Sequence, residues 1–305
     1  MKYSIYYKKK SLIKIIYYKL KEIFFSKNFI SGPDMVVISI ITSLKRYKIK
    51  FNINPSFKML NKNVIVLNDH EILKKLISFK KFKKFKLFAG PNISILPTEY
   101  SKLLLSPSID RVIVPSKWVK KLYLEVSKTL LNKIYVWPSP VDINKFTKQK
   151  RIIKEYDFLV YIKFFKDKSL LNKCILYLKK NYKIKIIYYG KYKINLFYSL
   201  LNKSKYSIFF SESESQGIMY FESWAANVPS LVYNKKKFFS KGLSTLADPC
   251  PYLDERYNGL GFENFNTFKR NIQKLFKQNK NPKKWLINKY NMKKQTIKLL
   301  SQFKY

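Results

Sequence analysis

Two glutamates, Glu214 and Glu222, are the residues of this chain whose type and spacing could do chemistry. They lie eight positions apart in the segment ESQGIMYFE, with Gly217 between them. Acidic residues are scarce, because the chain carries 18 Asp and Glu against 62 Lys and Arg. Carboxylates accept hydrogen bonds and a glycine lets a ligand approach the backbone closely. The segment therefore predicts a site for a ligand that carries hydroxyl groups.

The position of this segment between a strand and a helix adds a place for an anion. The run SIFFS predicts a buried strand, and GIMYFESWAANVP predicts a helix that ends at Pro229. A helix start presents unpaired N–H groups and the positive end of the helix dipole, so the backbone at Gln216, Gly217 and Ile218 could bind phosphate. A nucleotide sugar carries hydroxyls on both sides of a diphosphate. The alternative is a solvated loop followed by an ordinary helix face.

The elements that must position these groups alternate between strand and helix. The second half predicts strands at 156–165, 183–190, 206–211 and 230–234, a helix at 168–181, and two closing helices at 266–278 and 282–303. The first half shows the same alternation, with strands at 63–67, 86–93 and 133–137. Such alternation predicts parallel sheets with helices on both faces and ligands at the carboxyl ends of the strands.

The alternation starts again near residue 150, which predicts two domains. The fold class that we expect is α/β, with two Rossmann-like, doubly wound domains facing across a cleft. An N-terminal, acceptor-side domain would cover 1–150 and a donor domain 151–285, followed by a C-terminal helix at 286–305 that could pack back on the first domain. A length of 305 residues suits this division.

Composition limits the class of protein. No stretch approaches the roughly 20 uncharged apolar residues of a membrane span, and the amino terminus lacks a signal-peptide pattern. Cys174 and Cys250 have neither metal-site spacing nor the pattern of a disulfide framework. We therefore expect a cytoplasmic protein.

The net charge of +44 would suit a polyanion-binding protein. Only five of the basic residues are arginine, however, and arginine is the residue that specific base recognition favours. Nucleic acid is therefore an unlikely partner. The basic, apolar segments 8–27 and 79–88 could instead lie on an anionic membrane surface, or pack on the first domain with their lysines solvated.

Several segments resemble the GT-B glycosyltransferases of the retaining, family-4-like kind (glycosyl transferases group 1). SESESQGIMYFESWAANVPSLVYN is similar to the donor-site signature of that family, with its two glutamates, small-residue helix, proline and strand. SGPDMVV is similar to the glycine loop of the amino-terminal domain, and YVWPSPVDINKF and CPYLDERYNGLGF to later segments. KLFAGPNI and IDRVIVPSKWV match segments before the hinge. The resemblance covers about residues 31 to 270.

This resemblance implies roles for the donor-site residues. Glu222 would accept from the ribose hydroxyls, and Glu214, the catalytic candidate, would hold the donor sugar. The amides of 216–218 would bind sugar and phosphate. The reaction would transfer a sugar from a nucleotide-diphosphate sugar to a glycan or lipid-linked acceptor with retention. We expect no metal and no cofactor besides the nucleotide sugar as co-substrate, and assign no catalytic base.

The chain departs from the family where a Gly-Arg pair and a lysine would neutralise the diphosphate. That place has YIKFFKDK, so Lys163 and Lys168 are the candidate substitutes, although either could be an ordinary surface lysine. Pro140 also stands where the family has a glycine.

Four residues are candidates on the acceptor side of the cleft. Gly32 and Pro33 could face a ligand or simply shape a turn. His70, the one histidine, could serve the acceptor or merely begin a helix, and Asn92 could stabilise its own turn.

Three function classes follow. The first is the sugar-nucleotide-dependent transferase. The second is a non-enzymatic binder of polyanions or nucleic acid, and the third is an inactive transferase that serves as an interaction partner.

Overall fold

The computed structural model describes residues 2–8, 30–146, 153–240 and 243–304, which divide into two compact units. The first unit contains 32–140 with the start and the end of the chain, and the second contains 141–291. The expected basic segment 8–27 lies outside the described residues, apart from Lys8.

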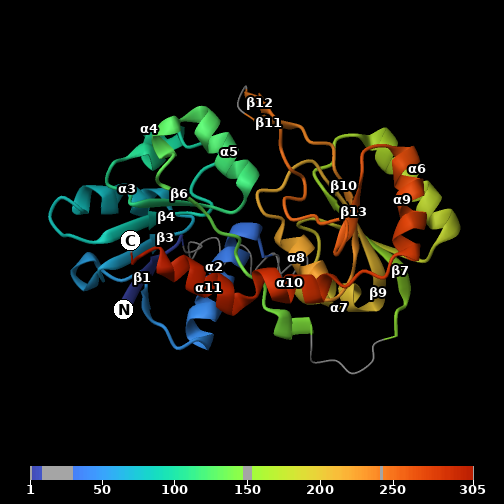
Figure 1. Cartoon of the computed structure of the whole chain (residues 1–305), viewed down its shortest axis with the longest axis horizontal. Coiled ribbons are helices and arrows are strands. Elements are labelled where there is room, and N and C mark those ends of the chain that lie inside the picture. Colours follow the sequence, from blue (N-terminus) through green and yellow to red (C-terminus); the bar gives the residue numbers. More distant parts are fainter. Residues whose placement is uncertain (1, 9–29, 147–152, 241–242, 305) are drawn as a thin grey trace, which may run out of the picture. The chain divides into compact units, whose positions relative to one another are not determined.

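The first unit is built on a parallel sheet of six strands in the order β2-β1-β3-β4-β5-β6 (Figure 1). The central residues Val64, Ile65 and Val66 have no exposed surface, as expected of a sheet covered on both faces. The strands are β1 Lys2–Tyr6, β2 Lys50–Ile53, β3 Asn63–Val66, β4 Lys86–Ala89, β5 Arg111–Val114 and β6 Ile134–Val136.

Helices connect these strands. α3 begins after Asp69, whose side chain accepts a hydrogen bond from the Ile72 amide. α5 has Ser116 as its N-cap residue, without a side-chain cap bond. The helices are α2 Gly32–Arg46, α3 His70–Phe79, α4 Glu99–Lys102, α5 Lys117–Val126 and α11 Met292–Ser301, with 3₁₀ turns η1 Phe57–Met59, η2 Leu103–Leu105 and η3 Lys128–Leu130.

The second unit is built on a parallel sheet of five strands in the order β13-β10-β9-β7-β8. A separate antiparallel pair, β11 and β12, precedes β13. The strands are β7 Tyr156–Lys163, β8 Ile184–Tyr188, β9 Ser204–Ser211, β10 Ser230–Tyr233, β11 Phe238–Ser240, β12 Leu243–Thr245 and β13 Gly259–Phe262. The helices are α6 Lys168–Asn181, α7 Ile194–Lys203, α8 Ile218–Ala225, α9 Phe265–Lys277 and α10 Pro282–Tyr290, with the 3₁₀ turn η4 Ile143–Phe146.

Both faces of the second sheet are covered, because alternate residues of β7 enter different cores. Phe158 and Val160 pack in a cluster with residues of α6 and α9, whereas Leu159 and Tyr161 pack in a cluster with residues of α7, α8 and α10. Figure 1 shows these two sets of helices on opposite sides of the sheet. The expected α/β fold with two Rossmann-like domains is confirmed.

The end of the chain differs from the single helix expected over 282–303. Asn291 has extended backbone angles, φ −63° and ψ 154°, and separates α10 from α11. α10 belongs to the second unit, whereas residues 292–305 belong to the first. There the Trp137 indole donates to the Gln295 carbonyl at 2.8 Å and the Phe303 ring stacks on Phe88 at 3.6 Å.

Candidate functional site

The strand order of the second sheet defines where a ligand should bind. The central pair β7 and β9 is a topological switch point, because the chain leaves the two strands toward opposite faces. After β7 the chain enters α6, which packs in one core, and after β9 it enters α8, which packs in the other. Lys163 and Ser211, the last residues of the two strands, are partners in the register. Their loops therefore start side by side.

Glu214 and Lys163 meet at this switch point. Glu214 is 7% exposed. The Lys163 ammonium lies 2.8 Å from its Oε1 and 2.9 Å from its Oε2, and the Ser211 hydroxyl donates to Oε1 at 2.7 Å. The same ammonium lies 4.7 Å from the centroid of the Tyr189 ring. A cation and an anion predicted from separate motifs thus form one partly buried ion pair.

Gly217 is the N-cap of α8 and has a left-handed backbone with φ 75°. A Cβ at this position would lie 2.3 Å from the ring of Tyr220, whose hydroxyl donates to the Pro249 carbonyl at 3.0 Å. Both the backbone angle and the packing therefore require glycine. Gln216 is buried, and Ile218 is the first residue of the helix. Anion binding at their amides stays a prediction.

Glu222 lies inside α8 with 3% of its surface exposed. The Tyr198 hydroxyl donates to its Oε1 at 2.7 Å. Burial raises the pKa of Glu222 to about 7, while the Tyr198 hydrogen bond and the charge of Lys145 act in the opposite direction. The Lys145 ammonium lies 5.5 Å from the Tyr198 ring. A carboxylate held in this way has little water to compete with an incoming hydroxyl.

Sequence reasoning missed Tyr198 and Lys145. Tyr198 lies on α7, which was not among the expected helices. The segment INLFYSLLNK nevertheless contained a usable signal, because Phe197, Leu200 and Leu201 have helical spacing and all three are buried. Lys145 lies in η4 and offered no comparable pattern.

Lys168 is separate from the Lys163–Glu214 pair. It is the first residue of α6, is exposed, and donates to the Phe165 carbonyl at 2.8 Å. Phe164, in the same segment YIKFFKDK, has φ 48° and is 77% exposed. Its ring meets Tyr189 edge-on at 5.4 Å. A role of Lys168 in phosphate binding stays a prediction.

Gly32 and Pro33 begin α2 in the first unit. Among the residues that the structure describes, none places an atom within 4 Å of a Cβ built on Gly32, and the φ of Gly32 is not in the left-handed region. Unlike Gly217, this glycine is not required by packing or by backbone conformation.

His70 and Asn92 follow β3 and β4 of the first sheet. His70 begins α3, stacks on Tyr100 at 3.9 Å, and has its Nε2 3.2 Å from the Glu71 carboxylate. Asn92 has φ 73°, and its buried Nδ2 has no hydrogen-bond partner among the residues that the structure describes. Acceptor roles for both residues stay predictions.

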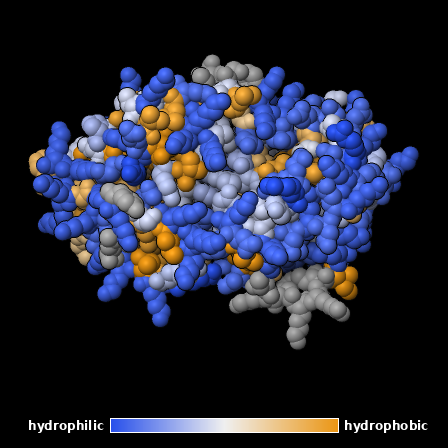
Figure 2. Space-filling view, in the orientation of Figure 1, coloured by the Kyte–Doolittle hydropathy of each residue, from blue (hydrophilic) through white to orange (hydrophobic). Residues whose placement is uncertain are grey.

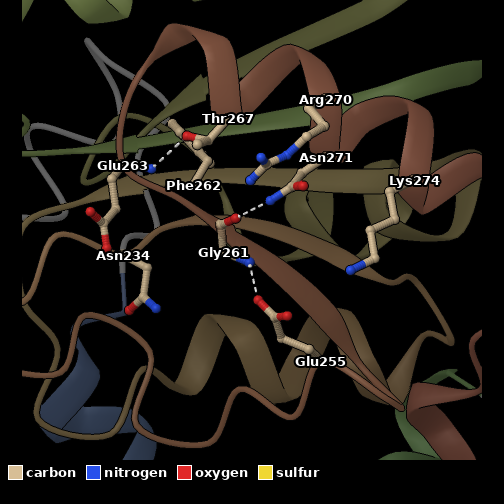
Figure 3. Close-up of a pocket in the computed structure, with 9 residues that line it drawn as sticks. All are labelled: Asn234, Glu255, Gly261, Phe262, Glu263, Thr267, Arg270, Asn271 and Lys274. Atoms are coloured by element: carbon tan, nitrogen blue, oxygen red, sulfur yellow. Dashed lines mark hydrogen bonds between the residues drawn. The ribbon is translucent and has the colours of Figure 1, made fainter.

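A pocket of 420 Å³ lies elsewhere in the second unit, at the open edge of the sheet (Figure 3). The backbone of Gly261 in the edge strand β13 is bonded by side chains: its N–H donates to Glu255 at 3.2 Å, and its carbonyl accepts from Asn271 at 2.6 Å. Arg270 and Lys274 bring positive charge from α9, and glutamates bring negative charge from the loops. The pocket contains none of the sequence-predicted residues and favours no single sign of charge.

Among the described residues, no group of three or more His, Cys, Asp or Glu side chains is arranged to hold a metal ion. The helices of these same residues include none with the length and hydropathy that a membrane crossing requires.

No family model matches the sequence, and no curated protein sequence matches it. Solved structures do match. A lipopolysaccharide outer core galactosyltransferase, WaaB, is 12% identical over 99% of this chain and 100% of that chain, with a TM-score of 0.61. A UDP-forming α,α-trehalose-phosphate synthase from Burkholderia xenovorans is 9% identical over 99% and 98%, with a TM-score of 0.59.

A third similar structure is TarM of S. aureus in complex with fondaparinux, α-GlcNAc-glycerol and UDP. It is 14% identical, with a TM-score of 0.56, over 80% of this chain and 56% of that chain. At sequence identities this low, the similarity to these structures shows only that the fold is shared. The chain has the GT-B fold, with two Rossmann-like domains that each contain a parallel sheet.

Proposed function

We propose that the chain is a glycosyltransferase that moves a sugar from a nucleotide-diphosphate sugar to a glycan or lipid-linked acceptor. One observation carries the proposal: Glu214, Lys163 and the start of α8 converge at the switch point of the second sheet. This is the part of a doubly wound sheet where ligands bind. The GT-B fold of the similar structures supports the same assignment.

In this proposal, each of the two buried carboxylates binds a different part of the donor. Glu222 accepts hydrogen bonds from the ribose hydroxyls, and Glu214 accepts from hydroxyls of the transferred sugar. The amides of Gln216, Gly217 and Ile218 hold the sugar and the phosphate at the first turn of α8. Because Lys163 and Ser211 already occupy both oxygens of Glu214, they also orient this carboxylate.

Lys163 has a second role when the glycosidic bond to the diphosphate breaks. Negative charge then accumulates on the leaving diphosphate, and a nearby ammonium stabilises that charge. Lys163 lies at the end of β7 and can serve both Glu214 and a phosphate, whereas Lys168 would have to leave the Phe165 carbonyl. The reaction as proposed retains the anomeric configuration and uses no metal and no cofactor besides the nucleotide sugar.

The protonation of Glu222 links donor binding to pH. With a pKa of about 7, this carboxyl is partly protonated at neutral pH and cannot then accept through both oxygens. Ribose hydroxyls favour the ionised form, so binding lowers this pKa. Donor affinity therefore rises with pH up to about 7 and then levels off.

One observation favours the inactive transferase as a second candidate. The segment YIKFFKDK lacks the Gly-Arg pair that the resemblance implies, and its candidate substitutes are already engaged, Lys163 with Glu214 and Lys168 with the Phe165 carbonyl. Turnover of a nucleotide sugar would exclude this candidate.

Calorimetry with UDP, GDP and dTDP tests the proposal on the wild type, on Glu222→Ala and on Glu263→Ala. Glu263 is an exposed glutamate at the edge pocket and serves as the control. We expect one nucleotide to bind with a clear preference, to lose at least about tenfold in affinity in Glu222→Ala, and to be unaffected by Glu263→Ala. Equal, salt-sensitive binding of all three nucleotides, unchanged in Glu222→Ala, would contradict the proposal.

A further inference from the structure

A groove of 840 Å³ lies on the first unit between α5, η3 and the edge strand β6. Leu124, Leu131 and Val136 form its apolar surface. Leu131 has 60% of its surface exposed, and Leu124 and Val136 are partly exposed. Apolar side chains gathered in one exposed groove mark an interaction surface more often than the same side chains scattered singly.

Lysines surround this groove. Lys117, Lys120, Lys121 and Lys128 line it, against the single acid Glu125. Glu125 lies 3.9 Å from Lys121 in an exposed ion pair, which leaves the groove strongly positive. Long lysine side chains can lay their methylene stems along apolar surface while the ammonium groups reach outward. The groove therefore pairs an apolar centre with a cationic rim.

The amino-terminal edge of the first sheet, next to the groove, also combines an exposed apolar side chain with lysines. Phe82 is 85% exposed and stands between lysines in the basic segment 79–88. The loop before β5 links the two places, because Lys80 donates to the Ser108 carbonyl at 2.8 Å and Lys133 donates to the Pro107 carbonyl at 3.2 Å. Residues that precede parallel strands lie at one edge, so Phe82 and η3 share the amino-terminal edge of the sheet.

We infer that this face of the first unit, the groove with the Phe82 edge, docks on the surface of an anionic phospholipid bilayer. Leucine and phenylalanine side chains would enter the boundary between headgroups and acyl chains, and the lysine rim would meet the lipid phosphates. The inference is independent of the sugar-transfer proposal.

The apolar centre distinguishes a bilayer from nucleic acid as the occupant. Binding to a duplex backbone uses cations and gains nothing from exposed leucines, whereas a bilayer uses both. Figure 2 shows a surface that is mostly hydrophilic, with several hydrophobic patches on it. In the groove, three apolar side chains and four lysines line one hollow, which is the combination that a bilayer surface can use.

Vesicle sedimentation of the full chain tests this inference. One vesicle preparation is phosphatidylcholine alone, and the other is phosphatidylcholine mixed with phosphatidylglycerol. We expect binding to the anionic vesicles, weakened but not abolished by salt, and little binding to the neutral ones. Replacing Lys117, Lys121 and Lys128 with glutamine should lower the partition coefficient roughly a hundredfold. Leu131→Ser should lower it about tenfold.

The second unit provides matched controls on α6. Lys173, Lys179 and Lys180 are exposed, so their replacement with glutamine removes the same charge from the chain. Leu176 is 69% exposed, so Leu176→Ser is the matched control for Leu131→Ser. Both control variants should bind vesicles within about twofold of the wild type. Leu131→Trp should strengthen binding to the anionic vesicles. Because this variant is expected to gain binding, its result cannot be explained by a loss of folding.

Three results would overturn the inference. The first is equal binding to neutral and anionic vesicles. The second is an equal loss in the α6 controls and in the groove variants. The third is duplex DNA bound as tightly as anionic vesicles, with Leu131→Ser neutral toward both, which would make the face a general polyanion surface.

Discussion

The two sheets of this chain have the same switch-point topology but different chemistry there. In the second unit, the ends of β7 and β9 bring together the Lys163–Glu214 ion pair. Among the described residues of the first unit, the loops after β1 and β3 meet through a neutral side chain, because the Asn68 side chain accepts from the Lys8 backbone amide at 3.0 Å. The topology specifies where a ligand can bind, and the Lys163–Glu214 pair is what gives the place in the second unit its oriented charges.

The glycines of the two units provide the sharpest test of this comparison. Gly217→Ala should lower the free energy of unfolding by about 3 to 4 kcal/mol, because it combines a left-handed backbone with a contact 2.3 Å from the Tyr220 ring. Gly32→Ala, whose new Cβ meets no described residue within 4 Å, should change it by less than about 0.5 kcal/mol. Chemical unfolding measures both. Equal effects would mean that the start of α8 is no more constrained than the start of α2.

Glu222 gives the second unit a pH-dependent stability. Its pKa is about 7 in the folded protein and 4.5 without burial, so between these values the folded state binds the proton more readily than the unfolded state. The free energy of unfolding should therefore fall as pH rises from about 4.5 to 7, by about 2 to 3 kcal/mol. Urea unfolding at several pH values should show this fall, and Glu222→Gln should remove it. A fall that persists in Glu222→Gln would assign the effect to another group.

The ion pair at the switch point can be compared with one away from it. Lys163→Met leaves Glu214 nearly buried without its cation and should cost about 2 kcal/mol of stability, together with about tenfold in donor affinity. Lys205→Met breaks the more exposed pair with Asp157 and should cost less than about 1 kcal/mol, with donor affinity unchanged. Unfolding and calorimetry on both variants measure the difference. An equal loss of donor affinity would show that general positive charge holds the ligand.

His70→Ala should have the smallest effect on the donor. The His70 ring stacks on Tyr100 in the first unit, so the change should cost about 1 kcal/mol of stability and alter donor affinity by less than about twofold. Calorimetry with the preferred nucleotide checks the second value. A tenfold loss of donor affinity would show that the first unit contributes to donor binding.

Long periodic segments could be predicted well because local residues decide them. The helix expected at 168–181 is α6, Lys168–Asn181, and the helix expected after Gly217 begins at Ile218. The strand β1 was missed, because it is buried along Tyr3 to Tyr6 and therefore lacks the alternation of a half-buried strand. The break at Asn291 was also missed, since apolar spacing continues from Trp285 and Leu286 to Met292 and beyond it.

The contacts of the two glutamates could not be predicted in the same way. The sequence placed Glu214 in a loop and Glu222 in a helix, and both positions are confirmed. It singled out Lys163 only as one of two candidate lysines and did not indicate Tyr198. A local pattern says which residues form a strand, but it does not say which strands become neighbours.

The amino-acid sequence by itself determined the alternating elements, the glycine at the start of α8 and the scarcity of acids that made Glu214 and Glu222 stand out. The tertiary structure decided their partners. Lys163 reaches Glu214 across 51 positions because β7 and β9 pair in register, and Tyr198 reaches Glu222 across 24 positions because α7 and α8 pack in the same core. The physical reason is that a parallel sheet brings the ends of distant segments to one edge, and burial among them turns ordinary side chains into oriented, partly desolvated groups.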